Sequence, residues 1–249
     1  MFDKILDSFI YIIEVSMRDI KFLTGNLIAH RGIHNERIKE NTLMAFDKAI
    51  MHNMPIELDI QLTCDNVVVV YHDESLRRLI GKNKKIKDLT YDELRSLASF
   101  IPTFKETLDF VRGRVPLLIE LKSYNKGYKL EEECVKLLDK YNGKFAIQSF
   151  KPWSIYWFRK NRRDWIRGQL VTNGYNYNFI SNIIYRHMLF NVFTKPDFIS
   201  YNIKGLPNKI IAKTRKKDII LGWTVRNDKQ LRKYYNYCDN FIVENIVRK

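Results

Sequence analysis

The stretch Ile56-Glu57-Leu58-Asp59-Ile60 combines strand-forming apolar residues with two carboxylates. Side chains alternate between the two faces of a strand, so Glu57 and Asp59 point to one side and the three apolar residues to the other. An isolated Glu-x-Asp pair is equally typical of a half-exposed strand whose acids face water. The neighbouring segments decide between these two interpretations.

Three further apolar runs also end in ionisable groups. The carboxyl ends of parallel strands converge on one mouth of a β/α barrel, which is where active sites lie. We therefore expect these groups to lie close to Glu57 and Asp59. The runs are residues 27–29 before His30, Arg31 and Gly32, residues 67–71 before His72 and Asp73, and residues 117–121, which include Glu120 and precede Lys122.

The chain contains seven short motifs in a fixed order. They are His30-Arg31-Gly32, Glu40-Asn41-Thr42 with Ala45-Phe46, Glu57-Leu58-Asp59, His72-Asp73, Glu120-Leu121-Lys122, Gln148-Ser149-Phe150 and Trp223-Thr224-Val225. Together they resemble the glycerophosphodiester phosphodiesterase family, from about residue 27 to the C-terminus. One such motif would be weak evidence, but the ordered set is specific.

The pattern along the chain predicts a TIM-type (β/α)8 barrel. Eight strand-like runs alternate with helical patterns in 249 residues, a usual size for one such barrel. Only residues 63–66 separate the run at 67–71 from the second strand, too few for a parallel crossover, so a β-hairpin and short helix are inserted there. Capping-box pairs Thr90/Glu93 and Thr103/Glu106 predict two helix starts. The eight runs are residues 27–30, 55–62, 115–122, 144–149, 166–171, 197–201, 219–225 and 240–244.

Residues 1–25 form an additional amphipathic helix in this prediction, beside one barrel domain at 26–249. Their charged residues are too frequent for a membrane-spanning helix or a signal peptide. Residues 245–249 are too few for the helix that usually closes such a barrel, so we favour packing of this N-terminal helix between the last and first strands. Docking on a membrane is the alternative. Residues 178–193 likewise predict a buried helix, with membrane contact as the second interpretation.

The net charge of +15 indicates an anionic partner. Lys and Arg are spread along the chain, and with the resemblance we expect a small glycerophosphodiester rather than a nucleic acid. Peripheral contact with an anionic membrane and the oligomeric state stay open. Cys64, Cys134 and Cys238 lack disulfide or metal spacing, which favours reduced packing residues in a cytoplasmic protein, or one peripheral on the inner membrane face.

Three of the acids suggest a metal site. Glu57, Asp59 and Glu120 would form an oxygen-rich cluster that suits Mg²⁺ or Ca²⁺ rather than zinc. Without a cation these carboxylates would repel one another. The resemblance implies the same metal role for these three positions.

The basic residues and histidines at the strand ends complete the expected chemistry. Arg31 and Lys122 can hold phosphate oxygens, pair with the acids, or do both. His30 and His72 are the expected general acid and base, because imidazole titrates near neutral pH. The resemblance implies that one histidine helps a glycerol hydroxyl attack phosphorus and that water then opens a cyclic phosphate. Which histidine does which stays open.

The remaining motif residues are less decisive. Gln148 and Trp223 resemble the family's mouth residues, a polar contact and an apolar wall for glycerol, but both also suit packing. His34, His52 and His187 match no motif and are expected at the surface. The chain departs from the family pattern at Cys64, at Asn66, which still suits a left-handed turn, and at Glu244, where Asp is usual.

These observations predict metal-dependent hydrolysis of glycerophosphodiesters to glycerol 3-phosphate and an alcohol. A lysophospholipase D acting on membrane lipids is an alternative within the same enzyme class. A catalytically silent barrel that binds anionic head groups is the alternative from another class. That interpretation requires loss of the catalytic set, and every member of the set is present.

Overall fold

Eight parallel strands close into a barrel in the computed structural model, which describes residues 19–124, 127–172 and 188–247. The first barrel strand pairs with both the second and the last, which closes the cylinder. The predicted TIM-type barrel is therefore confirmed. Its strands are β1 (Ile28–His30), β2 (Ile56–Leu62), β4 (Leu117–Leu121), β5 (Phe145–Ser149), β6 (Arg167–Val171), β7 (Phe198–Asn202), β8 (Ile219–Val225) and β9 (Asn240–Val243).

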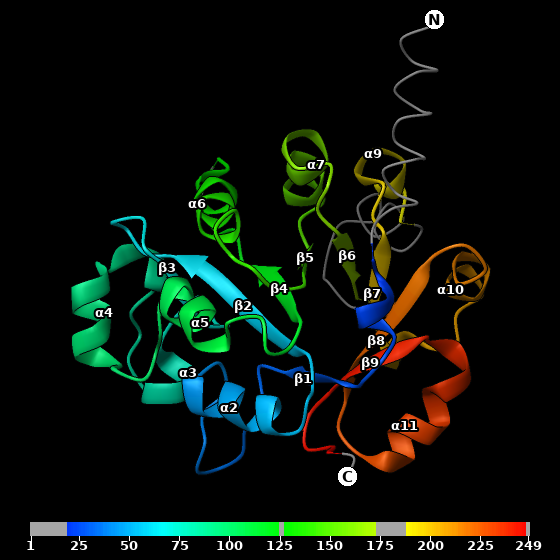
Figure 1. The fold of residues 1–249 in the computed structure, drawn as a ribbon, viewed down its shortest axis with the longest axis horizontal. Helices are drawn as coiled ribbons and strands as arrows, with labels where there is room; N and C mark the ends of the chain where they lie inside the picture. Colours follow the sequence, from blue (N-terminus) through cyan, green and yellow to red (C-terminus); the bar gives the residue numbers. More distant parts are fainter. Residues whose placement is uncertain (1–18, 125–126, 173–187, 248–249) are drawn as a thin grey trace, which may run out of the picture.

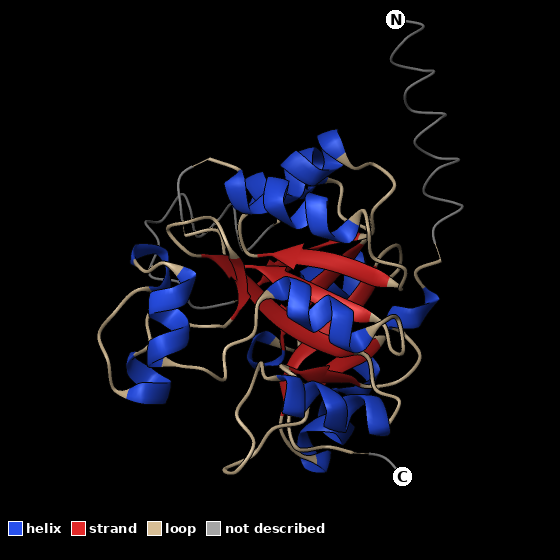
Figure 2. Cartoon of the chain, turned by 60° about the vertical axis from the view of Figure 1, so that its left-hand side comes forward, coloured by secondary structure: helices blue, strands red, loops and turns tan. Residues whose placement is uncertain are grey.

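Helices surround the barrel on its outer side (Figures 1 and 2). Each presents an apolar stripe to the strands, as in α2, which buries Ala45, Phe46 and Ala49. The covering helices are α2 (Leu43–Met51), α5 (Phe104–Val111), α6 (Lys129–Leu138), α7 (Pro152–Asn161), α9 (Asn191–Thr194), α10 (Lys209–Thr214) and α11 (Asp228–Tyr234). Short 3-10 turns are η1 (Lys21–Leu23), η2 (Ile86–Asp88), η3 (Ile203–Gly205) and η4 (Tyr235–Tyr237).

The predicted insertion after β2 is present. Strand β3 (Val68–Val70) pairs antiparallel with β2, and Asn66 in the turn has a left-handed φ of 64°. Helices α3 (Arg77–Ile80) and α4 (Tyr91–Leu97) follow and enclose a small separate core. Both predicted capping boxes form, at the starts of α4 and α5. The insertion brings the end of β3 back to the carboxyl ends of the barrel strands.

The barrel interior is apolar at the amino ends of the strands. Leu118, Phe198, Leu221 and Ile242 fill this floor together with Leu23 from η1, which is fully buried. A side chain on Gly168 would overlap the ring of Phe198, so glycine is needed there. The dry floor confines polar chemistry to the opposite end of the barrel.

The N-terminal expectation is tested only in part, because residues 1–18 lie outside the described residues. In residues 19–25 the chain forms the 3-10 turn η1 rather than an α-helix. Asn240 Nδ2 donates to the carbonyl oxygens of Leu23 and Asn26, at 2.7 Å each, and so fixes this turn to the start of β9. Most of the helix predicted at 178–193 also lies outside the described residues, and only α9 covers its end.

Two general expectations meet the structure as follows. Among the described residues, no helix has the length and apolarity needed to span a bilayer. Cys64, Cys134 and Cys238 are all free thiols. Cys134 and Cys238 are buried, but Cys64 is exposed, so its prediction as a packing residue is wrong. Cys64 lies in the turn between β2 and β3, where the chain reverses at the surface.

Candidate active site

The turn after β1 directs the backbone into the barrel mouth. Arg31 and Gly32 both have left-handed backbones, with φ of 58° and 76°. A Cβ at Gly32 would lie 2.7 Å from the carbonyl group of Ala45, so only glycine fits against α2. The turn aims the Arg31 backbone N–H at Glu57 Oε2, 3.1 Å away. The His-Arg-Gly motif therefore has a structural cause as well as a chemical one.

Each residue of the Glu40-Asn41-Thr42 motif has a separate partner. Glu40 accepts hydrogen bonds from Arg31 and Arg78. Asn41 is buried and donates from Nδ2 to Asp59 Oδ2 at 2.8 Å. Thr42 caps α2. The loop thus orients a carboxylate of the site while it starts the first helix.

The three predicted metal-ligating acids converge. Asp59 on β2 lies in register with Glu120 on β4, and Glu57 is two residues before Asp59 on the same face. All three are buried, and one carboxylate oxygen of each lies within 4.8 Å of the others. Burial, reinforced by the neighbouring Asp59 and Glu120 charges, raises the pKa of Glu57 well above its ordinary value. Closely spaced hard oxygen donors that oppose their own ionisation fit a divalent cation such as Mg²⁺ or Ca²⁺.

Two cations partly neutralise this cluster. Lys122 Nζ pairs with Glu120 and lies 3.1 Å from Asp59 Oδ1, and Arg31 Nε lies 3.2 Å from Asp59 Oδ2. Burial alone would raise the pKa of Asp59, but Lys122 and Arg31 outweigh it and hold that pKa below its usual range. Three acids against two cations leave an excess negative charge, which falls on Glu57. The ion-pair interpretation of Arg31 and Lys122 is thus correct.

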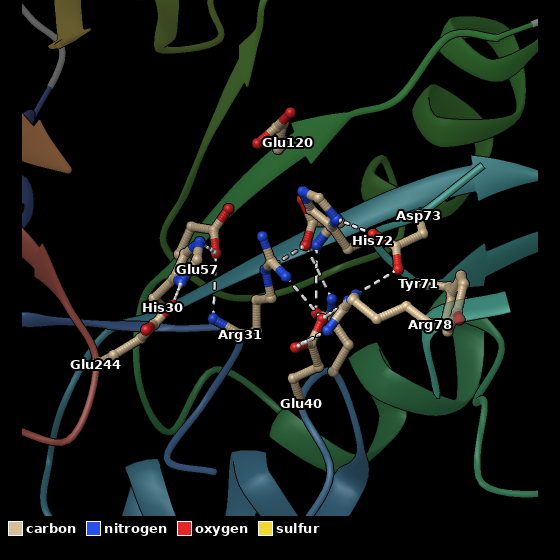
Figure 3. Close-up of polar contacts among 12 residues, drawn as sticks. His30, Arg31, Glu40, Glu57, Tyr71, His72, Asp73, Arg78, Glu120 and Glu244 are labelled. Atoms are coloured by element: carbon tan, nitrogen blue, oxygen red, sulfur yellow. Dashed lines mark hydrogen bonds and ion pairs between the residues drawn. The ribbon is translucent and has the colours of Figure 1, made fainter. Parts of the chain in front are cut away.

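His30 is held in one orientation by a carboxylate. Its Nδ1 lies 2.6 Å from Glu244 Oε1, and its Nε2 lies 3.9 Å from Glu57 Oε2 (Figure 3). Burial lowers the pKa of His30 to about 4, against the opposing effect of Glu244. The ring is therefore neutral at pH 7, with its proton on Nδ1 facing Glu244 and a lone pair on Nε2 facing the acids.

His72 is oriented in the same way from the insertion. Its Nδ1 lies 2.6 Å from Asp73 Oδ1, while Asp73 Oδ2 accepts from Arg78 Nε at 2.6 Å. Arg78 also pairs with Glu40, which pairs with Arg31. A continuous chain of ion pairs therefore joins the second histidine to the arginine at the end of β1, and Figure 3 follows it across the mouth.

The two predicted substrate-binding residues also lie at this end of the barrel. Gln148 on β5 is in register with Glu120, is fully buried, and accepts from Ser200 Oγ at 2.7 Å. Trp223 on β8 packs edge-on against Phe150, with ring centroids 5.6 Å apart. Gln148 Nε2 and Trp223 Nε1 are both buried and have no hydrogen-bond partner within the described residues.

Sequence reasoning missed several members of the site. Asp73 and Glu40 belonged to motifs but had no assigned role, and Arg78 carried no signal because its partners lie far away in sequence. Glu244 was noted only as a departure from the family pattern. The surface prediction for His34 is wrong, since it is half-buried near His30 and Glu244. His52 is exposed as expected, and His187 lies outside the described residues.

Comparisons with known proteins agree with this geometry. The model of the glycerophosphoryl diester phosphodiesterase family matches residues 30–245. YhdW of Bacillus subtilis, whose name places it provisionally among glycerophosphodiester phosphodiesterases, is 31% identical over 222 residues, covering 83% of this chain and 88% of YhdW. A human lysophospholipase D is 47% identical over 75 residues, which are 30% of this chain and 23% of that protein.

A solved structure shares the fold. An Oleispira antarctica phosphodiesterase in complex with the product sn-glycerol-3-phosphate has a TM-score of 0.73 to this chain and 19% sequence identity. The similarity covers 88% of this chain and 92% of the other. At this identity the comparison supports the barrel architecture alone.

Proposed function

This chain belongs to the glycerophosphoryl diester phosphodiesterase family, and from that premise we propose a metal-dependent hydrolysis of glycerophosphodiesters to glycerol 3-phosphate and an alcohol. The observation that supports it is one constellation at the barrel mouth. Three buried carboxylates, two cations and two carboxylate-oriented histidines lie together there. These groups answer the needs of phosphodiester cleavage, which are charge neutralisation, an activated nucleophile and a proton donor.

The cation site in this proposal consists of Glu57, Asp59 and Glu120, occupied by Mg²⁺ or Ca²⁺. A bound divalent cation would supply Lewis-acid polarisation of a phosphate oxygen. The chain's own cations act beside it. Arg31 and Lys122 each keep donors beyond those paired with the acids, and we propose that these donors hold the non-bridging oxygens of the phosphodiester.

His30 suits the role of general base. Its Nε2 carries a lone pair on the acid-cluster side, because Glu244 holds the proton on Nδ1. In the first step Nε2 takes the proton of a glycerol hydroxyl, the hydroxyl oxygen bonds to phosphorus, and the bond to the alcohol oxygen breaks. His72 gives a proton to that departing oxygen. In the second step His72 takes a proton from water, which opens the cyclic phosphate, and His30 returns its proton to the glycerol oxygen.

Gln148 and Trp223 suit the glycerol end of the substrate. Each offers a buried N–H donor that lacks a partner within the described residues, and such donors are costly unless a ligand satisfies them. Hydroxyl groups of glycerol could accept from both. Phe150, between Trp223 and the Lys122 ammonium, would face the carbon chain.

A second candidate is a lysophospholipase D activity on lipids at a membrane surface. Trp153, Val192 and Phe193 on α7 and α9 are 61%, 71% and 62% exposed. Trp153 is in the first turn of α7, close in sequence to the end of β5 that carries Gln148. Residues 149–163 and 188–196 contain five and one Lys or Arg, and no Asp or Glu. An apolar surface bordered by positive charge suits an anionic bilayer.

Localisation follows the same argument. The three free cysteines agree with the reducing cytoplasm, and the surface formed by Trp153, Leu189, Val192 and Phe193 would support peripheral contact with the inner membrane face. We propose a cytoplasmic enzyme with that contact. The N-terminal segment at residues 1–25, as a separate unit before the barrel domain at 26–249, remains part of this proposal.

One assay tests the two activities. Release of glycerol 3-phosphate is measured from glycerophosphocholine and glycerophosphoglycerol, and of lysophosphatidic acid from a lysophospholipid, with Mg²⁺ and with Ca²⁺. We expect turnover of the small diesters that a chelator abolishes. Turnover of the lysophospholipid alone would establish the second candidate. No release from any substrate with either ion would refute both.

A vesicle experiment tests the membrane surface separately. The double variant Trp153→Ser/Val192→Ser should lose binding to phosphatidylglycerol vesicles and keep turnover of a soluble diester. Met51→Ser is the matched control, since Met51 is 68% exposed on α2, away from α7 and α9. Equal vesicle binding by all three proteins would refute the proposed surface.

A further inference from the structure

A second group of possible metal ligands lies beside the catalytic constellation. His30 from β1, His34 from the loop that follows it, and Glu244 directly after β9 each offer one ligand atom, and these atoms lie within 4.8 Å of one another. All three side chains are partly buried. We propose that they form an inhibitory site for a transition-metal cation, with Zn²⁺ as the reference ion, distinct from the carboxylate cluster.

The donor types separate the two sites. Two imidazoles and one carboxylate make up a common zinc ligand set, whereas three carboxylates suit Mg²⁺ or Ca²⁺. Zinc bonds of about 2.0–2.1 Å place tetrahedral ligand atoms roughly 3.3 Å apart. His30 Nδ1 and Glu244 Oε1 are 2.6 Å apart, so they need to separate by less than an ångström. The mouth of this barrel therefore offers different metals different donors.

An unsatisfied nitrogen supports the proposal independently. His34 Nε2 is buried and has no hydrogen-bond partner within the described residues. A buried ring nitrogen in that state loses its bonds to water without replacement. If a cation is bound at His34, the ring can orient a nitrogen towards it and recover that loss.

Nearby positive charge limits the affinity. Arg226 Nε lies 2.7 Å from Glu244 Oε2, and Arg31 and Arg78 also act on His34 electrostatically. Arg226 is half-exposed and can withdraw into solvent when Glu244 binds a cation. We therefore expect reversible regulation rather than a permanent structural metal.

The consequence for catalysis follows from the tautomer of His30, and it rests on the proposed role of this residue as base. A cation on Nδ1 displaces the proton that Glu244 holds there. A neutral imidazole with a metal on Nδ1 carries its proton on Nε2, so it cannot accept one from a glycerol hydroxyl. Zinc at this site would thus inhibit without occupying the acid cluster.

The test uses the Mg²⁺-saturated protein and two matched variants. His34→Ala removes a proposed ligand that takes no part in the catalytic steps, and His52→Ala removes an exposed histidine at the end of α2. Zinc binding is measured by equilibrium dialysis, and inhibition by the rate of diester hydrolysis. We expect His34→Ala to keep its basal rate and to need at least ~10-fold more zinc for binding and for inhibition. His52→Ala should behave as the unmodified chain.

Several outcomes would overturn the proposal. These are equal zinc sensitivity of His34→Ala and the unmodified chain, relief of inhibition in proportion to added Mg²⁺, and no zinc retained in dialysis. Relief by Mg²⁺ would assign zinc to Glu57, Asp59 and Glu120 instead. If the chain hydrolysed no diester, the proposed function would fail, but the dialysis comparison would still decide the zinc site.

Discussion

Arg78 grips Glu40 with two hydrogen bonds, from Nη2 to Oε1 at 2.6 Å and from Nη1 to Oε2 at 2.9 Å. Arg78 belongs to the insertion after β2, and Glu40 to the loop after β1. The same guanidinium donates to Asp73, which orients His72. A planar fork that bridges two carboxylates fixes both in direction as well as distance. The insertion therefore holds one histidine of the site in place.

We predict that Arg78→Ala lowers kcat by roughly 10-fold or more, because small misplacements of a reacting group are costly. Its effect on the melting temperature should be small, since Arg78 is 46% exposed and surface ion pairs contribute little. Arg77→Ala, at the exposed neighbouring position, is the control. A lower melting temperature with unchanged kcat would show that Arg78 serves only the fold.

We predict that Glu57→Gln and Asp59→Asn each abolish hydrolysis while the barrel remains folded. Both side chains face the mouth, and the apolar contacts of β2 come from Ile56, Leu58 and Ile60 on its other face. Circular dichroism checks the fold, and a chelator should reproduce the loss of activity in the unmodified chain. Activity that survives the chelator would contradict the metal assignment.

We predict that the stabilisation given by Mg²⁺ increases with pH. The pKa of Glu57 is raised in the folded state, so the metal-free fold binds an extra proton and loses stability as pH rises from about 4.5 through that raised pKa. Mg²⁺ replaces that proton. The difference in melting temperature with and without Mg²⁺ should therefore be larger at pH 8 than at pH 5.

Glu57→Gln is the control for this pH effect, because an amide does not titrate. The dependence of the Mg²⁺ stabilisation on pH should shrink in this variant. Asp59 acts in the opposite sense, since its pKa is lowered, but its contribution is lost only as pH falls below about 3.8. An equal Mg²⁺ effect at pH 5 and pH 8 in the unmodified chain would be inconsistent with the raised pKa of Glu57.

We predict that His30→Ala and His72→Ala each lower kcat by about 10²–10⁴, the usual contribution of a positioned acid or base. The double variant should lose less than the product of the two, because residues that act together are not additive. Rates are compared at saturating diester and Mg²⁺. A single variant near the original rate would remove that histidine from the proposed chemistry.

The strands were predictable because their information is local. Each barrel strand is a continuous apolar run, so the predicted limits differ from the observed ones by at most two residues. The hairpin of β2 and β3 followed from loop length alone. The acids, Arg31, Lys122 and both histidines were predictable because strand ends converge whatever the details of packing.

The rest of the site depends on contacts that no local pattern encodes. Arg78 meets Glu40 across 38 positions and Glu244 meets His30 across 214. Neither pair has a periodicity, and both arise only when the barrel closes. The position of His34 likewise depends on the path of a loop. Leu23 was missed for a similar reason, because its burial depends on the floor that eight strands create together.

The last prediction concerns Leu23 and the segment before it. Leu23 is fully buried against the barrel floor, so Leu23→Ala should lower the free energy of unfolding by about 2–5 kcal/mol. Met51→Ala, at an exposed position, should change it little. Denaturant unfolding measures both. A chain that begins at Gly25 should be destabilised at least as much, because it lacks Leu23 altogether.

A chain that begins at Asp19 separates the two interpretations of the N-terminus, because it keeps Leu23 and removes only residues 1–18. If those residues pack between β9 and β1, as we favour, this truncation should lower the unfolding free energy below that of the full chain. Each large apolar side chain that is fully buried contributes about 1.5–3 kcal/mol, so the loss should be easily measured. If residues 1–18 instead lie on a membrane, the truncated chain should keep full stability and activity and bind anionic vesicles less. That second result would show our preferred interpretation to be mistaken.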